Sequence, residues 1–230
     1  MRRVAALLIA ALALAGCGGG APAGTAKPPA VRILPLGDSI TDGRTVPGAY
    51  RTALWKELTG AGARIDFVGS RQSGPSDLPD QDNEGHPGLR IDEIDADVTK
   101  WVNATDPRFV LIHLGTNDVF QEYELAGAPQ RLAKLVEHVQ RTAPDADVFV
   151  ATLIPLQDAT AQTRVAAYNA ALPDALRALG PKVHLVDMHA AVTVADLADG
   201  VHPNEAGYAK MGAAWAAALR PLMPITRPAT

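Results

Sequence analysis

The sequence has a single cysteine, few aromatic residues and no excess of positive charge. One cysteine excludes an internal disulfide and a zinc site built from cysteines. Aromatic residues make up only 5% of the chain, too few for a broad stacking surface. Lys and Arg number 21 against 25 Asp and Glu, giving a net charge of −4, so the chain lacks the basic surplus that neutralises a phosphate backbone. We therefore expect no nucleic-acid partner.

Apolar residues, by contrast, are plentiful. The 230 residues are 47% hydrophobic and 20% charged, which are ordinary values for a globular protein. This much apolar side chain offsets the entropy of ordering and excludes disorder for the bulk of the chain. Because a domain usually has about 100–200 residues, the length predicts one domain, with or without an appendage.

The first apolar run lies near the amino terminus and is short. Arg2 and Arg3 precede an unbroken stretch of Val, Ala, Leu and Ile at 4–15. A positive start followed by roughly 7–15 apolar residues is typical of a secretory signal. A transmembrane helix needs about 17–25 apolar residues, more than this run supplies. Residues 1–16 are therefore predicted to be a signal peptide.

The lone cysteine directly follows this run. Leu14-Ala15-Gly16-Cys17 resembles a bacterial lipobox, which implies cleavage before Cys17, lipidation of its thiol and acylation of the new amino terminus. Several acyl chains anchor a protein firmly to a membrane. The alternative is a plain signal peptide with an incidental cysteine. Residues 17–30, rich in Gly, Ala and Pro, are predicted to be a flexible tether, and residues 31–225 a folded domain.

Five short apolar runs in this domain predict strands. They lie at 31–37, 63–69, 109–115, 147–155 and 183–187. Nearly continuous apolar runs of this length suit strands that are covered on both faces. Helical patterns lie between and after them, at 48–59, 91–102, from Pro129 onward, at 160–179 with an interruption or kink at Pro173, and at 206–219. Alternating strands and helices predict an α/β fold with a parallel sheet.

Polar residues follow the first and third runs. Ser39, in Gly37-Asp38-Ser39-Ile40-Thr41, is placed at a strand-to-helix turn, where backbone N–H groups can stabilise negative charge. A helix N-cap would explain the same residues. Asn117, in Gly115-Thr116-Asn117-Asp118, carries a neutral amide that can face a developing oxyanion. An ordinary turn is the alternative there.

Two further segments complete a possible site. Gly88, within 84–90, could bring a backbone N–H close to a ligand, although Gly and Pro are also usual in loops. Asp199 and His202, three residues apart before the last helix, can place a carboxylate against one imidazole nitrogen and leave the other to take a proton from a serine. A capped helix start with a surface histidine is the alternative. Because the carboxyl ends of parallel strands share one rim, the four segments together predict a catalytic serine site.

These four segments, in this order, resemble the sequence blocks of the GDSL, or SGNH, hydrolases over about residues 31–220. The resemblance implies a flavodoxin-like three-layer α/β/α sandwich, with a sheet of the five strands predicted above. It also implies ester hydrolysis through an acyl-enzyme, with no metal and no other cofactor. By this resemblance Ser39 is the nucleophile and His202 the general base and then acid. Asp199 would orient His202, and the Ser39 N–H, the Gly88 N–H and the Asn117 side chain would form the oxyanion hole.

Segments 66–69 and 84–92 also resemble acetyl xylan esterases of carbohydrate esterase family three. Those enzymes often have a large aromatic residue directly after the second-block glycine, where this chain has Leu89. No long apolar insertion that could hold a fatty chain is present. We therefore expect an extracytoplasmic, lipid-anchored serine esterase whose substrate is a small ester or an acetylated polysaccharide.

Other functions remain open at this point. A lipase, thioesterase or lysophospholipase of the same superfamily would use the same residues. A surface lipoprotein that kept the fold but only binds a ligand is a different class, and it would be expected to lack one of the catalytic residues. The acidic stretch at 77–84 could bind calcium, but a solvated loop is the preferred interpretation.

Overall fold

The computed structural model describes residues 29–224. The predicted signal peptide, Cys17 and most of the predicted tether lie outside this range, as does residue 225. The described residues form a sheet at whose centre lie β1 (Val31–Gly37), β5 (Phe109–His113) and β6 (Asp147–Ala151). The remaining strands are β2 (Ile65–Phe67), β3 (Arg71–Gln72), β4 (Asp82–Gly85) and β7 (Val183–Val186).

Helices connect these strands. The longer ones are α2 (Ala49–Gly60), α3 (Ile91–Thr105), α5 (Ala128–Thr142), α6 (Ala159–Leu176) and α8 (Glu205–Leu219). Three short helices, α1 (Ser39–Asp42), α4 (Thr116–Phe120) and α7 (Met188–Ala191), follow strands directly. All five helical patterns read from the sequence are present. The short helices escaped prediction because four or five residues are too few to show a period. No helix among residues 29–224 is long and apolar enough to cross a membrane.

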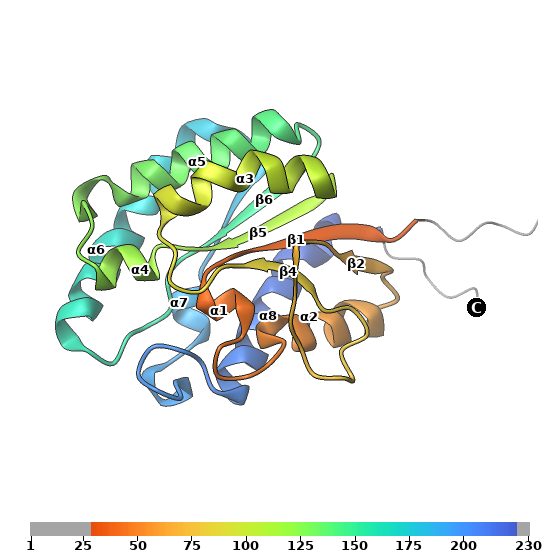
Figure 1. Cartoon of the computed structure of the whole chain (residues 1–230), viewed down its shortest axis with the longest axis horizontal. Coiled ribbons are helices and arrows are strands. Elements are labelled where there is room, and N and C mark those ends of the chain that lie inside the picture. Colours follow the sequence, from red (N-terminus) through yellow and green to blue (C-terminus); the bar gives the residue numbers. More distant parts are fainter. Residues whose placement is uncertain (1–28, 225–230) are drawn as a thin grey trace, which may run out of the picture.

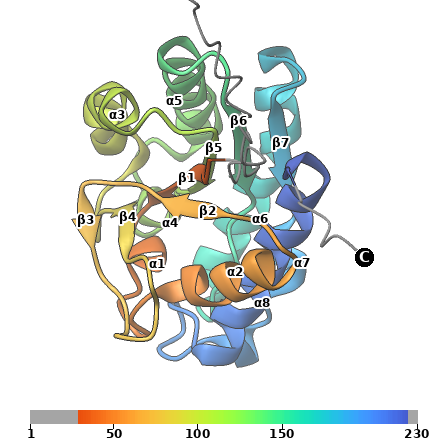
Figure 2. The ribbon, with the colours of Figure 1, turned by 90° about the vertical axis from the view of Figure 1, so that its right-hand side faces the viewer.

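The helices cover both faces of the sheet. Figure 1 shows α3 and α5 on one side of the strands and α2 and α8 on the other, and Figure 2 shows the same layers after a quarter turn. Helix α5 illustrates why the pattern folds this way. Its residues Leu132, Leu135, Val136 and Val139 lie on one helical face and are all fully buried. The three-layer α/β architecture is thus confirmed.

The five predicted strands are also confirmed as strands. Within the sheet they follow the order β2-β1-β5-β6-β7, and all their pairings are parallel. Numbered by their sequence positions among the five, this order is 2-1-3-4-5, that of flavodoxin-like sheets. Every residue of β5 and β6 is buried, as expected for strands that are covered on both faces.

The expected number of strands, however, is wrong: within residues 29–224 the sheet has seven. Strand β4 pairs with the last residues of β1, at Leu36 and Gly37, beyond the point where β2 stops, and β3 pairs antiparallel with β4. These two strands consist of Arg, Gln, Asp, Asn, Glu and Gly, so no apolar run marks them. Buried Asn83 and Glu84 are accommodated because hydrogen bonds satisfy them: the Asn83 side chain accepts one from Gly85 N, and the Glu84 carboxylate accepts one from Ser70 N.

Candidate active site

A pocket of about 410 Å³ opens at the carboxyl ends of β1, β4 and β5. The loop that precedes α8 closes its other side. The pocket is lined by Ser39, Arg44, Pro87, Gly88, Thr116, Asn117, Phe120, Asp199, Val201 and His202. All five residues singled out from the sequence are therefore brought to one place, across more than 160 residues of chain. The rim of a mostly parallel sheet is where such a site is expected.

Ser39 is the first residue of the short helix α1, immediately after β1. Its backbone N–H therefore has no acceptor within the helix. The turn is held tightly, because the Asp38 carboxylate accepts a hydrogen bond from Ile40 N at 2.9 Å. The carbonyl oxygen of Ser39 accepts bonds from Gly43 N and Arg44 N, at 3.1 and 3.2 Å. Ser39 thus lies on a hydrogen-bonded turn that lines the pocket.

His202 lies on the loop before α8 and contacts Ser39 directly. The Ser39 Oγ and His202 Nε2 atoms are 2.8 Å apart, and His202 Nδ1 is 2.8 Å from Asp199 Oδ2. The other oxygen of Asp199 accepts hydrogen bonds from the backbone N–H groups of Val201 and His202. One short segment therefore orients its own imidazole.

The Asp199 carboxylate is only partly removed from solvent, with 46% of its side chain exposed. Its partial burial raises its pKa, but the bonds from the His202 backbone and ring and from Val201 N outweigh this effect. The net result is a pKa below the usual value for aspartate. Asp199 is therefore ionised at neutral pH, where its negative charge can stabilise a protonated His202.

Gly88 supplies a free backbone donor to the pocket. Its φ of 85° lies in the left-handed region, which only glycine adopts without strain, and a side chain there would meet no neighbouring atoms. The requirement for glycine is thus conformational rather than steric. Within residues 29–224 the Gly88 N–H has no hydrogen-bond acceptor. The loop itself is tied to the nucleophile's strand, because His86 N donates to Gly37 O at 2.8 Å.

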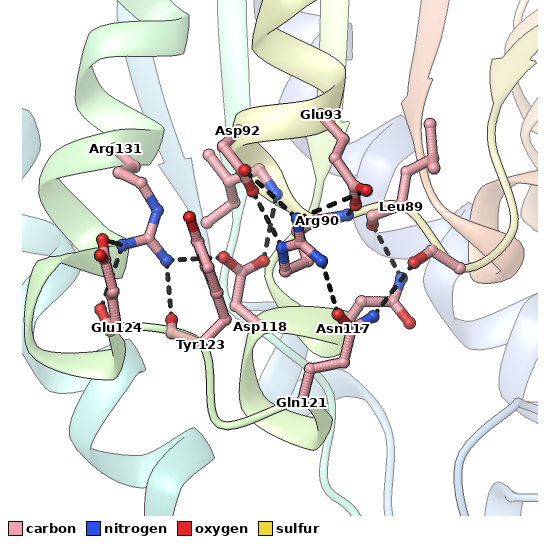
Figure 3. Close-up of polar contacts among 12 residues, drawn as sticks. Leu89, Arg90, Asp92, Glu93, Asn117, Asp118, Gln121, Tyr123, Glu124 and Arg131 are labelled. Carbon is pink, nitrogen blue, oxygen red and sulfur yellow. Dashed lines mark hydrogen bonds and ion pairs between the residues drawn. The ribbon is translucent and has the colours of Figure 1, made fainter.

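Asn117 lies in the first turn of α4 and reaches the same loop. Its Nδ2 donates to the carbonyl oxygen of Leu89 at 2.8 Å, as Figure 3 shows. An amide nitrogen carries two hydrogens, so this bond fixes the plane of the side chain and leaves the second N–H for a ligand in the pocket. The Ser39 N–H, the Gly88 N–H and the Asn117 amide are therefore three donors around one pocket, without a net charge among them.

A buried ion pair holds α4 against the start of α3. The Asp118 side chain is fully buried; one oxygen accepts from Ile91 N at 3.1 Å and the other from Arg131 Nη2 at 2.8 Å. Arg131 also donates to the carbonyl oxygens of Tyr123 and Glu124, which close the turn after α4 (Figure 3). Burial raises the pKa of Asp118, and the bond from Arg131 opposes that shift only in part. Both charges thus support the position of α4.

A second set of contacts holds the Gly88 loop from outside. Gln121 Nε2 donates to Gly88 O at 3.3 Å. Arg90 Nη1 donates to Gln121 Oε1 at 2.6 Å (Figure 3). The guanidinium of Arg90 also lies 4.3 Å from the centre of the Tyr123 ring. Apart from Asn117, the sequence analysis missed these positioning residues. Their contacts join segments about 30 residues apart, which no local pattern could show.

Asp38 is a buried carboxyl group directly before the nucleophile. Burial raises its pKa to about 6, while the bond from Ile40 N and the nearby charge of His202 act in the opposite direction. Its second oxygen has no hydrogen-bond partner within the described residues. Asp38 and Asp199 are thus two carboxyl groups of one site whose pKa values are shifted in opposite directions.

Five of the ten pocket residues were not predicted from the sequence as site residues: Arg44, Pro87, Thr116, Phe120 and Val201. Arg44 follows α1, Phe120 ends α4, and Val201 lies between Asp199 and His202. Phe120 is 42% exposed and is the one exposed aromatic among the large hydrophobic side chains of the described residues. Leu89, by contrast, packs against the hydrophobic core and does not line the pocket.

His86 and the acidic stretch serve the loop structure. His86 Nε2 pairs with Glu84 Oε1 at 2.6 Å, and its ring stacks on Trp101 with the ring centres 4.4 Å apart. Asp80 accepts hydrogen bonds from the backbone N–H groups of Phe67 and Asp82. Within the part of the chain that the structure describes, no group of three or more His, Cys, Asp or Glu side chains is arranged to hold a metal ion.

Comparison with known proteins shows similarity to esterases and acylhydrolases. A model of the GDSL-like lipase/acylhydrolase family matches residues 36–210, which include all the predicted site residues except Cys17. A multidomain esterase of Ruminococcus flavefaciens is 30% identical over 214 residues, which is 80% of this chain. The chain covers 28% of the length of that relative.

Solved structures show the same likeness in three dimensions. A family 3 carbohydrate esterase of Clostridium thermocellum has 34% sequence identity and a TM-score of 0.75, covering 84% of this chain and 99% of that one. An acetyl esterase mutant solved with an acetate ion has 28% identity and a TM-score of 0.72, covering 84% of this chain and 97% of that one. Both similarities span nearly all of the described residues.

Proposed function

Because the chain belongs to the GDSL-like lipase/acylhydrolase family, we propose that this serine esterase removes short acyl groups, acetyl in particular, from a carbohydrate. One observation carries the proposal: Ser39 Oγ lies 2.8 Å from His202 Nε2, while His202 Nδ1 lies 2.8 Å from Asp199. A hydroxyl, an imidazole and a carboxylate in this chain of contacts form an activated nucleophile with its base.

Acylation begins at Ser39. His202 Nε2 takes the hydroxyl proton as Oγ attacks the carbonyl carbon of the ester, and Asp199 stabilises the imidazolium that forms. The oxygen of the tetrahedral intermediate becomes negative and faces the Ser39 N–H, the Gly88 N–H and the free N–H of Asn117. When the intermediate collapses, His202 gives its proton to the leaving alcohol, and the acyl group stays on Ser39.

Deacylation repeats these steps with water. His202 takes a proton from a water molecule that attacks the acyl-enzyme, and the same three donors face the second oxyanion. The proton then returns from His202 to Ser39 Oγ as the carboxylic acid leaves. No step needs a metal ion or an organic cofactor, because the proton transfers and the charge stabilisation are supplied by the chain itself.

The preference for acetyl and for a sugar is supported by the pocket and by the relatives. The pocket is open and lined mainly by polar and small side chains, with Phe120 as its aromatic wall. An exposed aromatic ring suits the apolar face of a sugar ring. The similar carbohydrate esterase and the similar acetyl esterase act on substrates of this kind by their names.

A chain-length series tests the proposal. We expect the purified protein to hydrolyse p-nitrophenyl acetate much faster than p-nitrophenyl palmitate, and to release acetate from acetylated polysaccharide. A fluorophosphonate probe should label the wild-type protein but not Ser39→Ala. Faster hydrolysis of the palmitate ester would instead assign a lipase, thioesterase or lysophospholipase. Absence of both labelling and turnover would favour the alternative of a lipoprotein that binds a ligand without catalysis.

We further propose that the enzyme is exported and anchored by a lipid on Cys17. The support is the sequence at 1–17: a positive start, a short apolar run and a lipobox-like end. In a bacterial host, the wild-type protein should partition into the detergent phase of a Triton X-114 separation, and Cys17→Ser should move it to the aqueous phase. Equal partitioning of the two proteins would contradict the anchor.

A further inference from the structure

The pocket contains one positive charge that the reaction does not use. Among the ten residues that line it, the side chains that can carry a charge are those of Asp199, His202 and Arg44. The Asp199 carboxylate is already engaged by His202 and Val201. Arg44 is exposed, and its guanidinium makes no hydrogen bond or ion pair within residues 29–224.

This isolation sets Arg44 apart from the other arginines that the structure describes. Arg51 donates to backbone carbonyls, and Arg64 also interacts with other groups. The rest are paired with carboxylates: Arg32, Arg71, Arg90, Arg108, Arg131, Arg141, Arg164, Arg177 and Arg220. In a chain with more acidic than basic residues, a guanidinium without a carboxylate next to the catalytic serine is available for a ligand.

The backbone around Arg44 is held between the two catalytic segments. Arg44 N donates to Ser39 O at 3.2 Å, and the next residue, Thr45, donates from its hydroxyl to Pro203 O at 2.7 Å. Arg44 therefore lies beside the His202 loop, whereas Gly88 and Asn117 supply the oxyanion donors from other segments. His202 protonates the leaving alcohol, so the alcohol part of the ester lies on its side of the pocket. Arg44 lines the pocket from this side, within reach of the alcohol part of the ester rather than of the acyl group.

From this placement we infer that Arg44 binds a carboxylate on the sugar whose ester is cleaved, so that the enzyme prefers O-acetylated acidic sugars. The inference rests on the proposed carbohydrate esterase function and specifies its substrate class. Guanidinium matches carboxylate with two parallel hydrogen bonds, which gives direction as well as attraction. Such a carboxylate occurs in uronic acids and in the lactyl group of muramic acid, and the chemistry of recognition is the same for both.

Two matched pairs of substrates test the inference and distinguish these sources. The first pair is methyl 3-O-acetyl-glucuronoside and methyl 3-O-acetyl-glucoside, which differ in the carboxylate at carbon 6. The second pair is 6-O-acetyl-N-acetylmuramic acid and 6-O-acetyl-N-acetylglucosamine, which differ in the lactyl group. The measurement is the ratio of kcat/KM for the acidic member to that for the neutral member, from acetate release. We expect a ratio of about ten or more in at least one pair, as one charge-assisted contact provides.

Variants connect that ratio to Arg44. Arg44→Gln should bring the ratio to about one, and Arg44→Lys should keep part of it, because lysine retains the charge but not the forked geometry. Arg141→Gln, a change at an exposed arginine on α5, should leave the ratio at the wild-type value. Raising the NaCl concentration from about 20 to 500 mM should lower the wild-type ratio by screening the attraction.

The possible results separate this inference from the proposed function. A ratio near one in both pairs, or a raised ratio that Arg44→Gln retains, would overturn the role of Arg44 while acetate release still supports the esterase. If no acetate is released from any of the four compounds, the esterase proposal fails for these sugars. The dissociation constants of the four compounds for Ser39→Ala, with and without Arg44→Gln, then decide whether Arg44 selects the carboxylate.

Discussion

The two sides of the active site are built in different ways. On one side, Asp199, Val201 and His202 form a local unit whose hydrogen bonds span two or three residues. This segment is partly open to solvent. On the other side, Gly88 and Asn117 are positioned by contacts among the Gly88 loop, α3, α4 and α5, through a buried Asp118–Arg131 pair. One side therefore depends on close sequence spacing, and the other on the packing of the whole domain.

This difference predicts how each side fails. A change in the local unit should remove chemistry and leave the fold intact, because few other elements rest on it. A change in the packed side should reduce stability and activity together, since the same contacts hold α3 against α4. The first three variants below test this contrast and the fourth tests the buried carboxyl group before Ser39; they run from the largest expected effect to the smallest.

Asp199→Ala should have the largest effect on catalysis. We expect kcat to fall by about 10³-fold, somewhat less than the roughly 10⁴-fold loss for a buried triad carboxylate, because water can partly replace an exposed group. The melting temperature should change little. Steady-state kinetics and thermal unfolding measure the two effects, with the exposed Asp174→Ala as control. A loss of stability equal to the loss of transition-state stabilisation would contradict the local character of this unit.

Asn117→Ala should lower kcat by about 10²–10³-fold, through the loss of one oxyanion donor. It also removes the bond to Leu89 O, so a loop effect must be separated from the donor effect. Gln121→Ala serves as that comparison, because it removes the bond to Gly88 O without removing an oxyanion donor. If the two variants lose the same activity, Asn117 acts only by holding the loop.

Asp118→Asn should chiefly lower stability. The change leaves Arg131 largely buried beside a neutral amide, which is expected to reduce the free energy of unfolding by about 2–3 kcal/mol. Activity should fall by a smaller factor as α4 loosens. Urea unfolding measures the first effect. Asp174→Asn, in an exposed pair with Arg177, should change stability by less than about 0.5 kcal/mol. Equal effects of the two variants would refute the special importance of the buried pair.

Asp38→Asn should have the smallest effect, which is a change in stability that depends on pH. Burial raises the pKa of Asp38 to about 6, from 3.8 in an exposed chain. Between these values the folded protein keeps a proton that the unfolded chain has lost, so wild-type stability falls as the pH rises through this range. Asparagine can keep the cap on Ile40 N without this charge. The quantity to compare is the free energy of unfolding of the variant minus that of wild type. We expect this difference to be about 1–2 kcal/mol larger at pH 8 than at pH 4. A constant difference in urea unfolding at both values would show that Asp38 does not titrate there.

Sequence patterns alone were enough to predict five strands, five helices and the segments of the site. The reason is physical: fully covered strands need apolar runs, and amphipathic helices repeat their buried residues every three or four positions. The spacing of Asp199 and His202 was equally readable, because their contact is local. What the patterns missed was polar or short: strands β3 and β4, and the helices α1, α4 and α7.

Tertiary structure decided the remainder. Asp118 and Arg131 are separated along the chain, and their pairing depends on where α4 and α5 come to lie. In the sequence, Arg44 has no feature that distinguishes it from other loop residues. Only the fold shows that it lines the pocket and has no carboxylate partner among the described residues. Local contacts are encoded by neighbouring residues, whereas the environment of a charge depends on segments brought together from across the chain, and one sequence does not state that environment.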